Sequence, residues 1–202
     1  MARKTIAVDL DEVLSAQNEA VRLFANKHYG HNHTPEDYLT EGEYWGYWEV
    51  IWGVGKEEGL KRVAHFLDSG GLKGQKPIPG AIDAIKKLET KFNLVIVTSR
   101  EDKYMDITHK WLSEHFPDVF DHVRFTSMWG QKASAAKAKI VKEIKASYLI
   151  DDNVGHCNSV AKEDIKALLF GDYGWNRKAK LHPEVTRVRG WKEVLEYFDG
   201  QK

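Results

Sequence analysis

The chain has 202 residues, a length that suits one sizeable α/β domain or a domain carrying a smaller insertion. Its 30 Lys and Arg residues balance 30 Asp and Glu residues, and this zero net charge argues against a nucleic-acid polymer or a membrane surface as partner. The one cysteine, Cys157, excludes an intramolecular disulfide, and no stretch reaches the roughly 20 apolar residues of a membrane span. Because residues 1–20 contain no signal-peptide apolar region, we expect a soluble, cytoplasmic protein.

The first predicted element is a buried strand that ends in two acids. The apolar run at residues 6–8 is followed at once by Asp9 and Asp11. Ligands of open α/β sheets collect outside the carboxyl ends of the strands, so these carboxylates indicate a site. Acidic loops are common, and the prediction therefore depends on whether later strands bring complementary groups to the same edge.

Residues 15–78 are expected to form an all-helical insertion. Ser15 suits the N-cap of a helix that runs to about Tyr29. A second, amphipathic helix is expected at 57–67, and the glycine-rich residues 69–74 are typical of a hinge.

Aromatic side chains at helical spacing gather inside this insertion. They either form its own core, which is the commoner role, or offer a surface on which a ligand stacks. A nearby group of histidines lacks the fourth ligand of a zinc site, so we do not expect a metal there. The aromatic set is Tyr44, Trp45, Trp48 and Trp52, and the histidines are His28, His31 and His33.

Strands and helices alternate regularly after residue 78. The short connections between them predict a parallel sheet with helices on both faces, a Rossmann-like α/β fold. Together with residues 1–14, residues 79–202 would form this core. The expected strands are 93–97, 122–125, 148–150 and 167–170, and the expected helices are 81–91, 103–115, 134–145, 154–161 and 191–198.

Polar groups follow each of these strands. Carboxylates that meet at one edge repel one another, by about 4 kcal/mol for two charges roughly 4 Å apart at an effective dielectric near about 20, and Mg²⁺ relieves that repulsion. Hydroxyl groups and a cationic side chain beside the metal suit a phosphate. The groups are Thr98, Ser99 and Arg100 after the second strand, Thr126 and Ser127 after the third, Asp151 and Asp152 after the fourth, and Asp172 after the fifth.

One lysine is expected to join this edge. Lys137 shares the apolar face of the helix at 134–145, because it lies three, four and seven residues before the apolar positions of that face. A lysine on an apolar face needs a partner, which a bound phosphate or Asp151 would supply. Lys132, in the preceding loop, is the alternative.

Four short motifs, in chain order, resemble those of the haloacid dehalogenase superfamily. They are residues 9–13 (D-L-D-E-V), residues 98–100 (T-S-R), Lys137, and Asp151 with Asp152. The 5′(3′)-deoxyribonucleotidase-like branch of that superfamily is the most similar, although Glu12 stands where that branch often has glycine. The resemblance implies that residues 15–78 are a type 1 helical cap inserted after the first strand.

The resemblance also implies a Mg²⁺-dependent phosphomonoester hydrolase. Asp9 would be the nucleophile that forms an aspartyl-phosphate, and Asp11 would be the general acid and then the general base. Mg²⁺ would be held by Asp9, by Asp11 through its main-chain carbonyl, and by Asp152, with Asp151 in support. Thr98, Ser99, Arg100 and Lys137 would bind the phosphate.

Nucleoside monophosphates are the substrates that this resemblance favours. A sugar phosphate or another small metabolite is the alternative within the same class, and a non-catalytic binding module is the alternative from another class. Asp11 argues against the module, because a scaffold has no use for a general acid. We therefore expect a small phosphorylated substrate and a monomer or homodimer. The role of Glu12 stays open.

Overall fold

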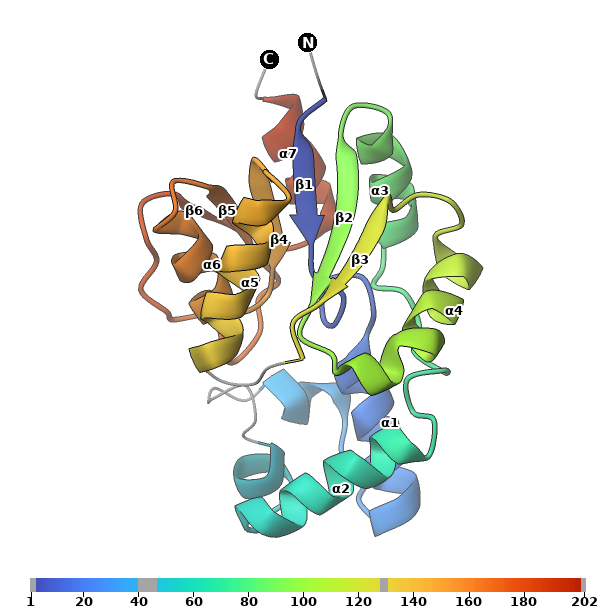
Figure 1. Cartoon of the computed structure of the whole chain (residues 1–202). Helices are drawn as coiled ribbons and strands as arrows, with labels where there is room; N and C mark the ends of the chain where they lie inside the picture. The colour runs from blue at the N-terminus through green and yellow to red at the C-terminus, as the bar shows by residue number, and fades with distance from the viewer. Residues whose placement is uncertain (1–2, 40–46, 128–130, 201–202) are drawn as a thin grey trace.

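A parallel β-sheet forms the centre of the computed structural model, which describes residues 3–39, 47–127 and 131–200. The sheet has six strands in the order β3-β2-β1-β4-β5-β6, and every neighbouring pair is parallel (Figure 1). The strands are β1 (Thr5–Val8), β2 (Asn93–Thr98), β3 (His122–Phe125), β4 (Tyr148–Asp151), β5 (Lys166–Phe170) and β6 (Val185–Val188). The predicted fold class is confirmed.

Burial explains why the apolar runs became central strands. Every residue of β4 is buried, as are residues 6–8 of β1, and a strand covered on both faces needs apolar side chains along its whole length. β3, at the edge of the sheet, instead alternates between exposed and half-buried positions. The register pairs Val8 with both Ile96 and Ile150, so the residues that follow β1, β2 and β4 leave the sheet side by side.

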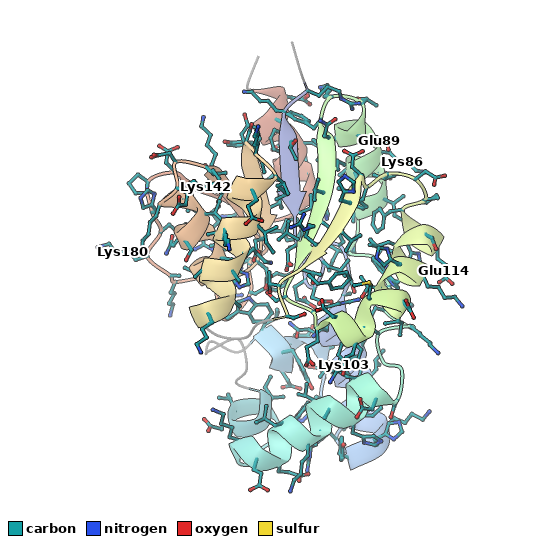
Figure 2. All side chains as sticks on the ribbon, in the orientation of Figure 1. Lys86, Glu89, Lys103, Glu114, Lys142 and Lys180 are labelled. Carbon is teal, nitrogen blue, oxygen red and sulfur yellow. The ribbon has the colours of Figure 1, made fainter. Side chains whose placement is uncertain are left out.

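Helices cover both faces of the sheet, and each face has its own apolar core. One core joins the sheet to α3 (Ala81–Glu89), α4 (Met105–His115) and α7 (Trp191–Asp199). The other joins it to α5 (Gln131–Glu143) and α6 (Val154–Ala161). Charged side chains such as Lys86, Glu114 and Lys142 point from these helices into solvent (Figure 2).

The segment between β1 and α3 is helical, as expected. It contains α1 (Gln17–Tyr29), η1 (Pro35–Leu39), η2 (Tyr47–Ile51) and α2 (Lys56–Asp68), and it lies beyond the carboxyl ends of the strands (Figure 1). Its buried side chains form a third core, separate from the two beside the sheet. This separate core supports the proposal that residues 15–78 are a cap over a domain of residues 1–14 and 79–202.

Trp52 belongs to the core of this helical segment. Its side chain is buried, and its indole nitrogen donates a hydrogen bond to the Tyr38 hydroxyl at 2.8 Å. Tyr44, Trp45 and the side chain of Trp48 lie outside the described residues. The question of a stacking surface therefore stays open for those three positions.

Two local predictions are wrong, and one strand was missed. Ser15 does not cap the first helix, because the helix begins at Gln17 and the Ser15 hydroxyl donates to the Gln75 side chain. α5 begins at Gln131, three residues before the expected start. β6 was not predicted, because only its two end residues are buried and the two between them are Thr186 and Arg187, so no apolar run marks it. No helix in the described ranges is long and apolar enough to cross a membrane.

Candidate active site

Three aspartates meet at the carboxyl ends of β1 and β4. The main-chain nitrogen of Asp9 donates to the carbonyl of Ile150 at 2.9 Å, which ties the end of β1 to β4. One carboxylate oxygen from each of Asp9, Asp151 and Asp152 lies within 4.8 Å of the other two, and all three residues are buried. Within the described ranges, this is the one group of acidic, histidine or cysteine side chains close enough to share a metal ion.

Lys137 reaches this group from α5. Its ammonium donates to Asp9 Oδ1 and to Asp151 Oδ2, at 2.7 Å each, and the side chain is fully buried. Burial alone would lower the pKa of Lys137, but the charges of Asp151 and Asp9 outweigh it and raise that pKa. Lys132 is exposed, and Lys142 on the same helix points to solvent (Figure 2). Of the two candidate lysines, Lys137 is therefore the one that the fold brings to the aspartates.

The charges of this group do not balance. Burial raises the pKa of Asp9 to about 6, although Lys137 opposes the effect. Burial, helped by the charges of Asp151 and Asp9, raises the pKa of Asp152 well above its ordinary range. Burial acts on Asp151 too, but Lys137 and His156 outweigh it and lower the pKa of that carboxyl. One lysine does not neutralise three buried carboxylates, and a divalent cation would offset the excess.

The loop after β5 holds Asp152 in place. The indole nitrogen of Trp175 donates to Asp152 Oδ2 at 2.9 Å. The fully buried Asn176 donates to the carbonyls of Asp152 and Phe170, at 3.0 and 2.9 Å. Asp172, which was expected at the same edge, is exposed and pairs with Arg177 at 2.9 Å. The expectation for Asp172 is therefore wrong, because its side chain turns outward from the loop that delivers Trp175 and Asn176.

Two hydroxyl groups at the ends of β2 and β3 have no hydrogen-bond partner in the part of the chain that the structure describes. Ser99 Oγ and Thr126 Oγ1 are both buried, and neither has a hydrogen-bond partner among the described residues. The two strands are adjacent, and the Thr126 nitrogen donates to the Thr98 carbonyl at 2.9 Å. The Thr98 hydroxyl accepts from the Arg100 main chain at 3.2 Å. Buried hydroxyls normally find partners, so Ser99 and Thr126 suit the oxygens of a bound anion.

Asp11 pairs with Arg100 and is not one of the three aspartates that meet. The guanidinium donates from Nε to Asp11 Oδ2 at 2.9 Å and from Nη2 to Asp11 Oδ1 at 2.5 Å. The same guanidinium also donates to Thr108 and Gln75. Arg100 is thus committed to protein partners, and the phosphate contact expected of it stays a prediction. The carboxylate of Asp11 lies outside the metal group, which leaves the main-chain carbonyl as its predicted contribution.

Glu12 faces the helical segment rather than solvent. It has a positive φ of 59°, a backbone conformation that side chains other than glycine rarely adopt. Its buried carboxylate accepts from the main-chain nitrogen of Asn18, in the first turn of α1, at 2.6 Å. The Tyr173 hydroxyl donates to the Glu12 carbonyl at 2.7 Å. Glu12 therefore caps α1 in the place expected for Ser15.

Sequence patterns missed two residues that contact the site. His156 lies 3.1 Å from Asp151 Oδ2, and Gln75 contacts Arg100, yet neither follows a strand nor repeats in a motif. Residues 171–177 follow the fifth expected strand, which predicts that this loop reaches the same edge, and the contacts of Trp175 and Asn176 with Asp152 confirm it.

Solved structures define the class of this fold. A haloacid dehalogenase-like family hydrolase from Streptococcus pneumoniae superimposes with a TM-score of 0.69 at 15% identity, over 97% of this chain and 98% of that one. A HAD-hydrolase from Bacillus subtilis, whose structure is bound to magnesium, gives a TM-score of 0.64 at 16% identity, over 98% and 100% of the two chains. The fold is that of the haloacid dehalogenase-like hydrolases, as the four motifs predicted.

Sequence comparison identifies the family within that class. The model of the family described as "5' nucleotidase, deoxy (Pyrimidine), cytosolic type C protein" matches residues 3–198. A protein named "Putative 5'(3')-deoxyribonucleotidase" from Staphylococcus epidermidis is 27% identical over 202 residues, which cover 98% of each chain. A protein of the same name from Staphylococcus aureus is 27% identical over 205 residues, covering 98% of this chain and 97% of that one. The chain belongs to this 5′ nucleotidase family and is an enzyme of the phosphatase class, as predicted.

Proposed function

We propose that this enzyme is a Mg²⁺-dependent phosphomonoesterase that acts on nucleoside monophosphates through an aspartyl-phosphate. The observation that carries the proposal is the buried group of Asp9, Asp151 and Asp152, two of which pair with one buried lysine. The names of its family and its relatives favour a nucleotide as substrate. Family membership speaks against the non-catalytic alternative.

The donor set fits magnesium. Hard carboxylate and carbonyl oxygens are the ligands that Mg²⁺ prefers, and the excess negative charge needs a cation. Asp9, Asp152 and the main-chain carbonyl of Asp11 would hold it. Asp151 would support the site, because Lys137, His156 and the Asn153 nitrogen already occupy its oxygens. When bound, Mg²⁺ would polarise the phosphoryl group and offset its charge.

The two aspartates of the first motif have separate tasks. An oxygen of Asp9 attacks phosphorus, the bond from phosphorus to the alcohol oxygen breaks, and Asp11 gives its proton to that oxygen. Water then attacks the phosphorus of the aspartyl-phosphate, its proton passes to Asp11, and the bond from phosphorus to Asp9 breaks. Inorganic phosphate leaves with both aspartates restored.

Lys137 and the hydroxyl groups would hold the phosphoryl group during these steps. The ammonium of Lys137 already contacts the attacking carboxylate of Asp9, so it lies beside the point where charge moves. Ser99 and Thr126 offer donors that no described residue uses. Thr98 contributes through the main chain of the same turn, whose geometry its hydroxyl stabilises.

The decisive test is the removal of the nucleophile. Asp9→Asn should abolish phosphate release, whereas Asp172→Asn, a matched change in the exposed aspartate after β5, should leave it unchanged. Acid quenching of the wild type during turnover, followed by peptide mass spectrometry, should locate a phosphoryl group on Asp9. Substantial turnover by Asp9→Asn would contradict the covalent mechanism. Activity that survives exhaustive chelation would contradict the metal.

A phosphatase for a sugar phosphate or another small metabolite is the second candidate. It is favoured by the burial of Trp52, because a side chain inside the core of the cap offers no face to a nucleobase. A panel of phosphate esters separates the two: a preference for nucleoside monophosphates over sugar phosphates supports the first, and no preference supports the second.

A further inference from the structure

Arg100 uses four of its five N–H donors in hydrogen bonds to three residues. Its Nε and Nη2 form a fork with the carboxylate of Asp11, at 2.9 and 2.5 Å. Nη1 donates to the Thr108 hydroxyl at 3.1 Å, and Nη2 also donates to Gln75 Oε1 at 2.7 Å. Only 6% of Arg100 is exposed. A buried guanidinium held at every nitrogen has one orientation, and a bidentate fork transfers that orientation to the carboxylate.

Gln75 is itself fixed where the chain passes between the sheet and the helical segment. Its side-chain oxygen accepts from the hydroxyl of Ser15, which lies on the connection from β1 to α1, whereas Gln75 itself lies on the connection from α2 back to α3. The main-chain carbonyl of Gln75 accepts from the Trp111 indole at 2.7 Å. The two connections are joined by main-chain hydrogen bonds, from Ala16 to the Lys76 carbonyl at 2.9 Å and from Ile78 to the Leu14 carbonyl at 2.7 Å. Gln75 therefore links Arg100 to the two chain segments that connect the sheet with the helical segment.

We propose that Arg100 and Gln75 are positioning residues that set the direction of the Asp11 carboxylate for proton transfer to the leaving alcohol. Asp11 lies in a loop after β1, and its side chain is 13% exposed, so the sheet alone does not fix its rotamer. A general acid that is displaced by about an ångström can lose roughly 10²-fold in rate. The fork removes that freedom while using one lone pair on each oxygen, so the acid form would carry its proton on a lone pair that Arg100 leaves unused. This inference rests on the proposed role of Asp11 as general acid.

The dependence of the rate on the leaving group separates this role from a merely structural one. A nitrophenolate leaves as a stable anion and needs no proton, whereas the alkoxide of a nucleotide does. In a mechanism with a covalent intermediate, kcat/KM covers only the steps up to departure of the alcohol, so it isolates the acid from the later base. Loss of positioning should thus lower kcat/KM for an alkyl ester and spare p-nitrophenyl phosphate.

Arg100→Lys is the principal variant, because it keeps the charge and loses the fork. We expect kcat/KM for a deoxynucleoside 5′-monophosphate, or for whichever alkyl ester the enzyme hydrolyses fastest, to fall about 10- to 100-fold, and kcat/KM for p-nitrophenyl phosphate to fall less than about threefold. Gln75→Leu should act in the same direction with a smaller effect. Arg22→Lys is the matched control, because Arg22 forms a similar fork with Glu19 on α1, at 2.7 and 2.6 Å.

Asp11→Asn distinguishes failure of this inference from failure of the proposed mechanism. If Asp11→Asn also spares p-nitrophenyl phosphate while Arg100→Lys lowers both substrates equally, the acid role stands and the positioning role is overturned. If Asp11→Asn shows no dependence on the leaving group, the proposed acid role itself fails. A gain in alkyl-ester turnover by Arg100→Lys also overturns the inference, because the fork would then keep Asp11 away from the leaving alcohol. Thermal unfolding shows whether each variant is folded. If Arg100→Lys is not folded, the comparison of the two substrates with Gln75→Leu tests the positioning role.

Discussion

Lys137→Met is the change whose consequences the structure defines most sharply. Methionine keeps an apolar stem of similar length but removes the charge that contacts Asp9 and Asp151 at 2.7 Å each. Removing one partner of a buried ion pair typically costs about 3–5 kcal/mol, because the other charge stays buried and unpaired. Here Asp9 and Asp151 both lose the ammonium, although Asp151 keeps its contacts with His156 and the Asn153 nitrogen, and Asp152 lies within the same group. We therefore expect a loss of stability in the upper part of that range.

The measurement is thermal unfolding with and without Mg²⁺. At about 2–4 °C for each kcal/mol in a chain of this size, a loss of about 4–5 kcal/mol in Lys137→Met should lower Tm in EDTA by roughly 8–20 °C. Mg²⁺ should raise the Tm of the variant more than that of the wild type, because the ion takes over part of the lysine's role. Turnover at saturating Mg²⁺ should stay reduced by about 10²–10³-fold, since we propose that Lys137 also holds the phosphoryl group.

Lys139→Met is the control on the same helix. The Lys139 side chain is 79% exposed and lies 3.9 Å from Glu143, an arrangement that contributes less than about 1 kcal/mol. Its removal should leave both Tm and turnover nearly unchanged. If Lys137→Met loses no more stability than Lys139→Met, or if Mg²⁺ stabilises it no more than the wild type, the electrostatic account of the site is refuted.

Three further changes test neighbouring parts of the site. Burial raises the pKa of Glu12 from 4.5 to about 8, so between these values the folded state keeps a proton that the unfolded state has released, and stability falls as pH rises. Glu12→Gln should remove this dependence of stability on pH. In metal-free urea unfolding, the free energy of unfolding of the variant minus that of the wild type should therefore grow by about 2–3 kcal/mol from about pH 5.5 to about pH 7.5. The same difference at both pH values would contradict this account of Glu12. Trp175→Phe keeps the ring but loses the hydrogen bond to Asp152, and calorimetry should show Mg²⁺ bound about tenfold more weakly, whereas equal affinity would exclude this support. Ser99→Ala should lower kcat/KM about 10-fold without loss of Tm, because its buried hydroxyl has no partner among the described residues; a fall in Tm alone would argue for a structural role.

Much of the fold could be predicted because the relevant signals are local. A strand buried on both faces must be apolar along its length, which marks β1, β2, β4 and β5 in the sequence. β6 escaped because it is short and half polar. The edge at which the acids meet followed from the parallel arrangement, since all carboxyl ends then point the same way. Lys137 could be predicted because it lies on the apolar face of its helix, and that face packs toward the sheet, where Asp9 lies.

The sequence by itself determined the class of the fold, the order of the motifs, and the residue types that gather at one edge of the sheet. Only the tertiary structure decided how they pair. Arg100 donates to Asp11 and to Gln75, and the Glu12 carboxylate accepts from the first turn of α1. The physical reason is that local periodicity places a residue on a face or at a strand end, whereas a hydrogen bond needs the direction of two side chains. Arg100 and Asp11 are 89 residues apart in the chain, and their directions follow from the packing of the helical segment against the sheet.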